Sequence, residues 1–426
     1  MIHACLYPNR TRSFLFSALF TLVLFQFWIS SAASAAKSEV PVIEKASDIL
    51  PWEIVSGRHH RVRETVTCHG HMHNYVVDSD YGVFEVTGDF ALYRTIREIH
   101  TIAVLREIRK GESFLKGVVH AASQPIEFGE NLLIHPVDTL SGIPQGIASF
   151  FETLKTGLTT RPGKNEDRKV EQVLAVSSNK RRWAQQLGID VYSSNKVLQK
   201  ELGDVAWGAS LGSLTVSVAL LPVGGPAVTA FSLSRAAQQL RDCVNQYPPQ
   251  KLRQINQEKL MAMGMSRDLV TLFLDQPNYT LTQQTSIVNS LEVMSGAGGR
   301  DAVLQLTLSA YDEESADFFM RIAETMRGYH LKVAPISEIS LHDSLLFARA
   351  SNGTVVIALP LDCVMWTEVV GEWIPAAIAR YKAMNPGLKM YDIWLTGTAS
   401  EMARNEVAKT GVRIVEKVGN QIEFTY

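Results

Sequence analysis

Three histidines alternate with other residues early in the chain. On a β-strand His69, His71 and His73 would share one face, because successive side chains of a strand point to opposite faces. Imidazole nitrogens at this spacing suit Zn²⁺ or Cu²⁺. The pattern therefore predicts a candidate metal site at these three histidines, although the spacing fixes no carboxylate or fourth ligand, and Cys68 would face away. The alternative is that they form the solvated face of an antiparallel hairpin.

A serine stands in a Gly-x-Ser-x-Gly frame made by Gly208, Ser210 and Gly212. In α/β-hydrolases this frame forms a sharp strand-to-helix turn that exposes the nucleophile. Here the preceding residues 196–202 have helical spacing, and no glycine-rich oxyanion loop precedes the serine. The alternative is that the small residues let helices pack closely. Ser210 is therefore the candidate catalytic residue of a secreted, esterase-like serine hydrolase. Spacing leaves open which partners would complete it: Asp317 or Asp343, with His330 or His342.

Two further features lie near the C-terminus. The turn Leu395–Ser400 could hold a phosphate at the start of a helix. It lacks a Walker-type lysine, so ordinary helix capping by Thr398 or Ser400 is the simpler interpretation. Asp362 and Glu368 flank a tryptophan at the end of a predicted strand and could line a cleft there.

The central stretch Val205–Ser234 contains no ionisable side chain. As a helix, Val205–Leu221 would span roughly 25 Å at about 1.5 Å per residue, which is short of a hydrocarbon core of about 30 Å. Residues 222–226 contain two prolines and two glycines and would interrupt the helix. We therefore expect an apolar, glycine-rich helical hairpin that packs inside the protein or contacts lipid or a partner.

Residues 1–36 are typical of a signal peptide. Arg10 and Arg12 precede the apolar run Ser13–Ile29, and small residues such as Ala33 and Ala35 follow it. The sequence thus predicts a periplasmic or secreted protein, with membrane association as a further option. Three cysteines remain after cleavage and allow one disulfide, whose pairing the sequence leaves open: Cys68, Cys243 and Cys363.

The 426 residues are 46% hydrophobic and 20% charged, with a formal net charge of -2. This balance is that of a globular protein and argues against a basic nucleic-acid-binding surface. The length suggests two or three domains. After the signal peptide we expect an N-terminal α+β region (37–160), a charged linker or helix (161–192), a helical domain (193–332) and a small C-terminal α/β domain (333–426).

The fold class is therefore α+β. The N-terminal region should contain a β-hairpin, with strands Asn74–Val77 and Val83–Thr87, and then the helix Asp89–Lys110. Helical spacing in the charged region begins near Asn179. The C-terminal domain should contain several strands and helices and end in a closing strand. Its predicted elements are Leu345–Ala350, Thr354–Leu359, Glu368–Met384, Met390–Leu395, Ser400–Thr410, Val412–Val418 and Gln421–Tyr426.

These features favour an exported, envelope-associated, non-catalytic binding or scaffolding protein. Its expected partners are membrane lipid or another envelope protein, and no nucleic acid. The sequence implies no particular cofactor. The two alternatives are the serine hydrolase and the histidine metal-binding module described above.

Overall fold

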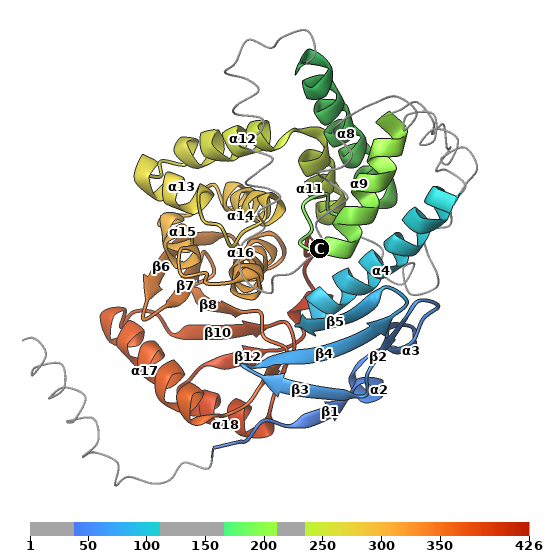
Figure 1. Cartoon of the computed structure of the whole chain (residues 1–426). Coiled ribbons are helices and arrows are strands. Elements are labelled where there is room, and N and C mark those ends of the chain that lie inside the picture. Colours follow the sequence, from blue (N-terminus) through green and yellow to red (C-terminus); the bar gives the residue numbers. More distant parts are fainter. Residues whose placement is uncertain (1–37, 111–165, 211–234, 426) are drawn as a thin grey trace, which may run out of the picture.

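The protein is an α+β protein, as the sequence predicts. The computed structural model describes residues 38–110, 166–210 and 235–425, with residues 166–176 described by their backbone alone. Three groups of elements follow one another along the chain: an antiparallel sheet, a set of helices, and a second sheet flanked by helices (Figure 1). The predicted signal peptide lies outside the described residues.

The N-terminal sheet is built around β4, which is paired along both edges. Strands β3 and β2 pair with successive parts of one edge and β5 pairs with the other, all antiparallel. The predicted hairpin is confirmed, because β4 and β5 contain both predicted strands. Strand β1 extends the sheet beside β3, and two short helices follow β1. The bounds are β1 Ile43–Lys45, α2 Ala46–Ile49, α3 Trp52–Val55, β2 His60–Val62, β3 Thr65–His69, β4 Met72–Ser79 and β5 Gly82–Thr87.

Helix α4 spans Asp89–Lys110, as predicted, and joins the sheet to the helical group. Its first turns bury Leu92, Ile96 and Ile99 against the N-terminal sheet. Its later turns bury Ile102 and Leu105 against the helices that follow. One helix thus contributes to two hydrophobic cores, because its apolar residues recur at helical spacing over its whole length.

The helical group fills the middle of the chain. Its first helix begins at Glu166, well before the predicted start near Asn179, so most of the charged region is helical. The turn between α12 and α13 is made by Gly264, with φ of 85°, and by Ser266, whose side chain caps α13. The bounds are α8 Glu166–Leu187, α9 Lys196–Ser210, α11 Arg235–Gln246, α12 Pro249–Ala262, α13 Arg267–Leu274, α14 Leu281–Val293, α15 Asp301–Thr307 and α16 Glu313–Lys332.

The C-terminal sheet has the strand order β12-β10-β8-β7-β6. Strands β8, β10 and β12 are parallel, and β6, β7 and β8 form an antiparallel meander. Helices α14–α16 cover one face and α17 and α18 the other, which explains why β7, β8 and β10 are apolar on both faces. The bounds are β6 Ile336–His342, β7 Leu345–Ala350, β8 Thr354–Leu359, β9 Cys363–Val364, α17 Glu368–Met384, β10 Met390–Leu395, β11 Thr398–Ala399, α18 Glu401–Lys409, β12 Arg413–Val415 and the 3₁₀ turn Val418–Asn420.

The predicted closing strand Gln421–Tyr426 is wrong: as far as Thr425, where the description ends, these residues form no strand. The tail instead enters the helical group, where Ile422 and Phe424 join the core. Gly328 of α16 makes room for it, because a Cβ on this glycine would lie 2.6 Å from the Cβ of Ile422. Burial of two large apolar side chains favours this path over another edge strand.

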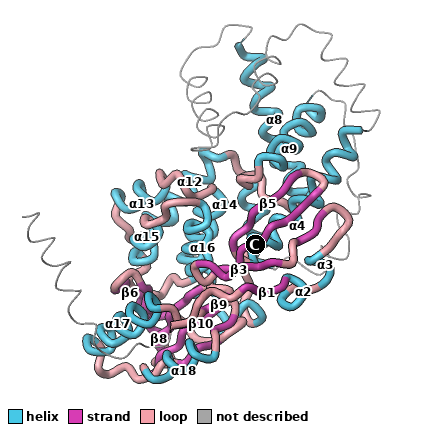
Figure 2. Tube along the Cα trace, turned by 60° about the horizontal axis from the view of Figure 1, so that its bottom comes forward, coloured by secondary structure: helices cyan, strands magenta, loops and turns pink. Residues whose placement is uncertain are grey.

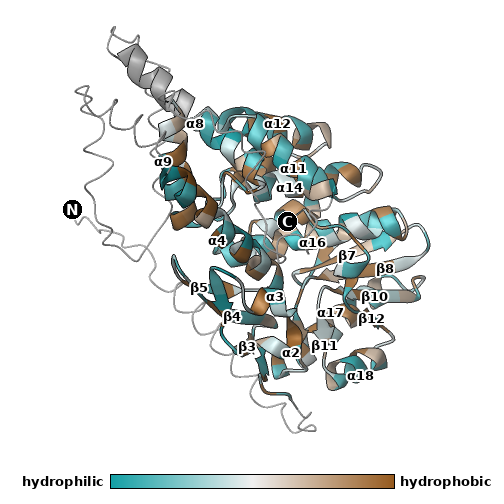
Figure 3. Ribbon diagram, turned by 90° about the vertical axis from the view of Figure 1, so that its right-hand side faces the viewer, coloured by the Kyte–Doolittle hydropathy of each residue, from teal (hydrophilic) through white to brown (hydrophobic). Residues whose placement is uncertain are grey.

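The uncharged stretch begins inside the described helices. Val205 and Ala206 of α9 are completely buried. Helix α9 itself packs against α4 and α8 (Figure 3). The predicted helical hairpin falls mainly on residues 211–234, which lie outside the described residues. No helix in the described ranges is both long and apolar enough to cross a membrane.

Candidate functional site

The three alternating histidines lie on two strands and the turn between them. His69 ends β3 and is exposed, His71 lies in the turn, and His73 is buried on β4. The expectation of one continuous strand through these residues is therefore corrected. Gly70 and His71 both have positive φ, 59° and 66°, as a two-residue type I′ hairpin turn requires. The glycine inside the alternating run is the signal that could have revealed this turn.

The turn of this hairpin docks on the segment that follows β8 of the C-terminal sheet (Figure 2). The carbonyl of His71 accepts hydrogen bonds from the N–H groups of Asp362 and Cys363, both at 3.1 Å. Its Nδ1 accepts the N–H of Met365 at 3.3 Å. Burial lowers the pKa of His71, so the ring stays a neutral acceptor at neutral pH.

A disulfide between Cys68 and Cys363 ties the same two segments together across a sequence separation of 295 residues. Cys243 on α11 is a free thiol. The structure thus contains the one disulfide that the sequence allows, and its pairing joins the N-terminal sheet to the segment that follows β8 of the C-terminal sheet.

The β3–β4 hairpin and the segment after β8 thus form a joint between the two sheets. Next to this joint, His73 lies between two carboxylates. Its Nδ1 is 2.7 Å from Asp89 Oδ1, and its Nε2 is 2.9 Å from Glu44 Oε2. Burial on its own lowers the pKa of His73. The hydrogen bond and charge of Asp89, together with the charges of Asp362 and Glu44, outweigh burial and raise this pKa above its ordinary value. The imidazole therefore favours its protonated form here.

A third carboxylate, that of Asp362, approaches from the segment between β8 and β9. Its Oδ2 accepts the backbone N–H groups of His73 and Asp89, each at 3.2 Å. Asp362 is only 2% exposed, and its burial together with the charge of Asp89 raises its pKa to about 7. Tyr75 completes the group, since its hydroxyl donates to Asp89 Oδ1 at 2.7 Å. We call His73, Tyr75, Asp89, Asp362 and Glu44 the joint cluster.

Local structure explains how the joint cluster is positioned. His73 and Tyr75 share a face of β4 because they are two residues apart. Asp89 opens α4 directly after Gly88, whose φ of 95° turns the chain out of β5. Asp362 follows β8, at the carboxyl edge of the parallel strands, where α/β sheets commonly present functional groups. Gly397, in the loop after β10, lies so close that a Cβ would be 1.9 Å from the carbonyl oxygen of Asp362.

Ser210 is the last residue of α9 and does not follow a strand. Its hydroxyl donates to the carbonyl of Trp207 at 2.7 Å. Gly212 of the same frame lies outside the described residues. The four candidate partners are engaged elsewhere: Asp317 with Arg94, Asp343 with Arg380, His330 with the N–H of Ile336, and His342 with the ring of Tyr381.

The turn after β10 is a helix cap. The side chain of Ser400 accepts the N–H of Ala403 at 3.0 Å and thus caps α18, while Thr398 belongs to β11. The capping interpretation of this turn is confirmed for Ser400. Glu368, which the sequence pairs with Asp362, is the first residue of α17 and does not belong to the joint cluster.

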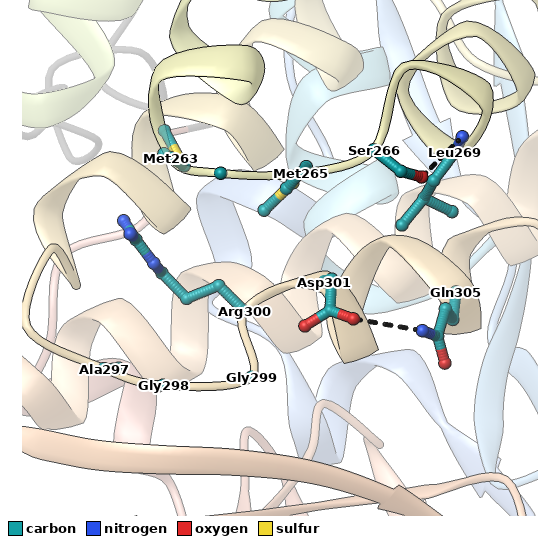
Figure 4. A pocket seen from close by; sticks show the side chains of 11 residues that line it. Met263, Met265, Ser266, Leu269, Ala297, Gly298, Gly299, Arg300, Asp301 and Gln305 are labelled. Carbon is teal, nitrogen blue, oxygen red and sulfur yellow. Dashed lines mark hydrogen bonds between the residues drawn. The ribbon is translucent and has the colours of Figure 1, made fainter.

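One pocket of about 500 Å³ lies elsewhere, between the α12–α13 turn and the start of α15 (Figure 4). Met263, Met265 and Leu269 form its apolar side, and Arg300, Asp301 and Gln305 its polar side. Asp301 and Gln305 are hydrogen-bonded to each other at 3.2 Å. None of its lining residues belongs to the joint cluster.

Comparison of the chain with protein-family models gave no match. Comparisons with curated proteins and with solved structures also gave none. The chemistry of the site therefore has to be argued from its own residues. Within the described parts of the chain, His73, Asp89 and Asp362 form a group of potential metal ligands whose donor atoms all lie within 4.8 Å of one another.

Proposed function

We propose that the chain is an exported, envelope-associated, non-catalytic binding or scaffolding protein. In this proposal the uncharged stretch Val205–Ser234 engages membrane lipid or another envelope protein. The observation that carries the proposal is that this stretch begins within α9, a helix whose residues Val205 and Ala206 are buried in the protein core.

Helices α4 and α9 run side by side in the same direction. Asn195, just before α9, donates to Glu98 in the middle of α4 at 2.9 Å. Arg109, near the end of α4, pairs with Glu201 at 2.5 Å and with Asp204 at 2.8 Å, which lie further along α9. The two helices therefore end on the same side of the protein (Figure 1). Chain segments 111–165 and 211–234 both begin there.

The start of the uncharged stretch is fixed in the core. Val205 and Ala206 are 0% exposed, so the helix that leads into residues 211–234 is anchored by burial of its apolar side chains. A stretch without charge costs little to place against lipid or an apolar partner surface, because no ionised group has to lose its water.

The disulfide supports the export part of the proposal. Stable disulfides form in the periplasm and outside the cell and are rare in the reducing cytosol. The Cys68–Cys363 bridge connects the two sheets, and its cysteines come from opposite ends of the mature chain. Export would allow this joint to be locked after folding.

Carbonate extraction of membranes from cells that express the full chain tests the proposal. We expect the wild type to remain with the membrane fraction and to float with phospholipid vesicles after purification. The double substitution Val218→Lys and Leu220→Lys puts two charges into the uncharged stretch and should release the protein into the soluble fraction.

Leu272→Lys is the matched control, because Leu272 is an apolar residue on α13 that is already 59% exposed. It should leave the distribution unchanged. A wild type found wholly in the carbonate supernatant, with no flotation and no envelope protein recovered by crosslinking from residues 211–234, would refute the proposal.

A further inference from the structure

We propose that the joint cluster is a divalent metal site, in which His73 Nδ1, Asp89 and Asp362 bind the ion and Zn²⁺ is the metal that fits best. This site differs from the histidine trio that the sequence suggests, since it uses His73 alone of the three. It also does not depend on the proposed membrane or partner contact.

The donor set has the composition of a zinc site with open positions. One imidazole nitrogen and two carboxylate oxygens suit Zn²⁺, which commonly takes three protein ligands and leaves a position for water. The donor atoms already lie within 4.8 Å of one another. Bonds of about 2.0–2.2 Å would place them roughly 3.4 Å apart around a tetrahedral ion. His73 and Asp89, now 2.7 Å apart, would have to separate only slightly.

The surrounding hydrogen bonds are those that orient metal ligands. A ligating histidine usually donates its second ring N–H to a carboxylate, which fixes the ring. With Nδ1 directed to the ion, His73 Nε2–H would donate to Glu44, which lies 2.9 Å away. The carboxylate of Asp89 is held in turn by the Tyr75 hydroxyl at 2.7 Å.

The hydrogen bonds of Asp362 leave one of its carboxylate oxygens available for a metal ion. The residue is only 2% exposed, and its Oδ2 accepts both of its hydrogen bonds. Within the described residues, Oδ1 accepts none. The lone pairs of Oδ1 are therefore available to bind a cation.

Charge balance points the same way. Three carboxylates meet at one imidazole, and in the described part of the chain none of the three forms a salt bridge with lysine or arginine. A protonated imidazole offsets one negative charge at most. A divalent ion that replaces the proton of Nδ1 would neutralise the group more completely.

The experiment uses the full oxidised chain, stripped with a chelator and dialysed against micromolar ZnCl₂ or MnCl₂, with metal content measured by elemental analysis. We expect one Zn²⁺ per chain and weaker retention of Mn²⁺. Asp362→Asn keeps an oxygen that can accept the two N–H groups, and Asp89→Asn keeps the side-chain shape. Each should weaken Zn²⁺ binding by at least about 100-fold, because even loss of an outer-shell partner typically costs 10–100-fold.

Two controls and one milder variant complete the design. Asp78→Asn makes the same change on β4 outside the cluster, where Asp78 pairs with Arg63, and should bind as the wild type does. His69→Ala removes an exposed histidine of the trio and should also bind normally. Glu44→Gln changes a side chain that is 35% exposed, so it should fold normally and lose roughly 10–100-fold in affinity.

Four outcomes would overturn the proposal. The wild type could retain neither Zn²⁺ nor Mn²⁺, or the Asp362 and Asp89 variants could fold and bind with wild-type affinity. His69→Ala could abolish binding while Asp362→Asn does not, which would place the metal at the hairpin turn. If the Asp362 and Asp89 variants fail to fold, unchanged affinity in folded Glu44→Gln would count equally against the proposed site.

Discussion

The disulfide between Cys68 and Cys363 should contribute a large part of the stability of the joint between the two sheets. Replacing both cysteines by serine removes a crosslink with a sequence separation of 295 residues. Loop-closure entropy for a loop of this length corresponds to roughly 5–6 kcal/mol, whereas measured disulfides typically contribute about 2–4 kcal/mol. We therefore expect the free energy of unfolding to fall by about 3 kcal/mol.

Urea unfolding followed by tryptophan fluorescence measures this loss. The side chains of Trp183, Trp366 and Trp394 are only 5%, 6% and 3% exposed, so unfolding exposes all three to water. They lie in three different cores, so the signal reports on the helical group and on both faces of the C-terminal sheet. With a slope of about 3 kcal/mol per molar urea, the midpoint should shift down by about 1 M.

Cys243→Ser is the matched control, because this cysteine is free and half-buried. It should change the unfolding free energy by less than about 1 kcal/mol. Wild type treated with a reductant should unfold at the same urea concentration as the double serine variant. The reasoning fails if the double variant unfolds at the wild-type midpoint, or if Cys243→Ser loses as much stability.

Three other predictions follow from single sites. Burial and the neighbouring rings of His60 and His59 lower the pKa of His100 to about 4, so below about pH 6.5 the unfolded state binds a proton that the folded state excludes. After allowance for the partial exposure of His100, the free energy of unfolding should fall by about 1–3 kcal/mol between pH 7 and pH 4.5. His100→Leu should reduce this pH dependence, measured by urea unfolding at each pH. Gly397→Ala should lower the free energy of unfolding by more than about 2 kcal/mol, because the new Cβ would clash with the backbone of Asp362. Gly203→Ala on α9 has open space around it and should raise the free energy of unfolding by about 1 kcal/mol. Equal effects of the two variants in thermal unfolding would contradict the close approach of Gly397 to Asp362. A fluorophosphonate probe should not label the protein, because the Ser210 hydroxyl is held by the Trp207 carbonyl within a helix, and labelling that disappears in Ser210→Ala would restore the hydrolase hypothesis.

Local patterns predicted many elements closely. Helix α4 and strands β7, β8 and β10 begin and end at the predicted residues, since hydrophobic periodicity and the Asn352-Gly353 turn are properties of the local sequence. Strand β6 was not predicted. Its pairing with β7 shifts between Ile336 and Glu338, and this irregularity breaks the alternation that marks a strand.

The joint cluster could not be assembled from the sequence. Asp362 stood out only as an acidic residue after a predicted strand, and His73 only as one of three alternating histidines. The amides that bind the Asp362 carboxylate, those of His73 and Asp89, are 289 and 273 residues away from it in the chain. No local period carries information over such distances, and the cysteine pair that does connect these regions was one of three pairings that spacing allowed.

The disulfide and the joint cluster act on the same two segments. Cys68 lies directly opposite His73 in the β3–β4 pair, and Cys363 directly follows Asp362. The crosslink therefore limits how far the buried Asp362 carboxylate can move from the imidazole and from Asp89. Negative charges on Glu44, Asp89 and Asp362 repel one another, and the protonated form of His73 offsets only one of them. A covalent tie beside the cluster can hold these charges together without a bound cation, and it can equally keep a metal site preorganised for one. With or without a bound metal ion, His73 and Asp89 lie close to Asp362 because the two sheets are joined here, and neither sheet alone brings these side chains together.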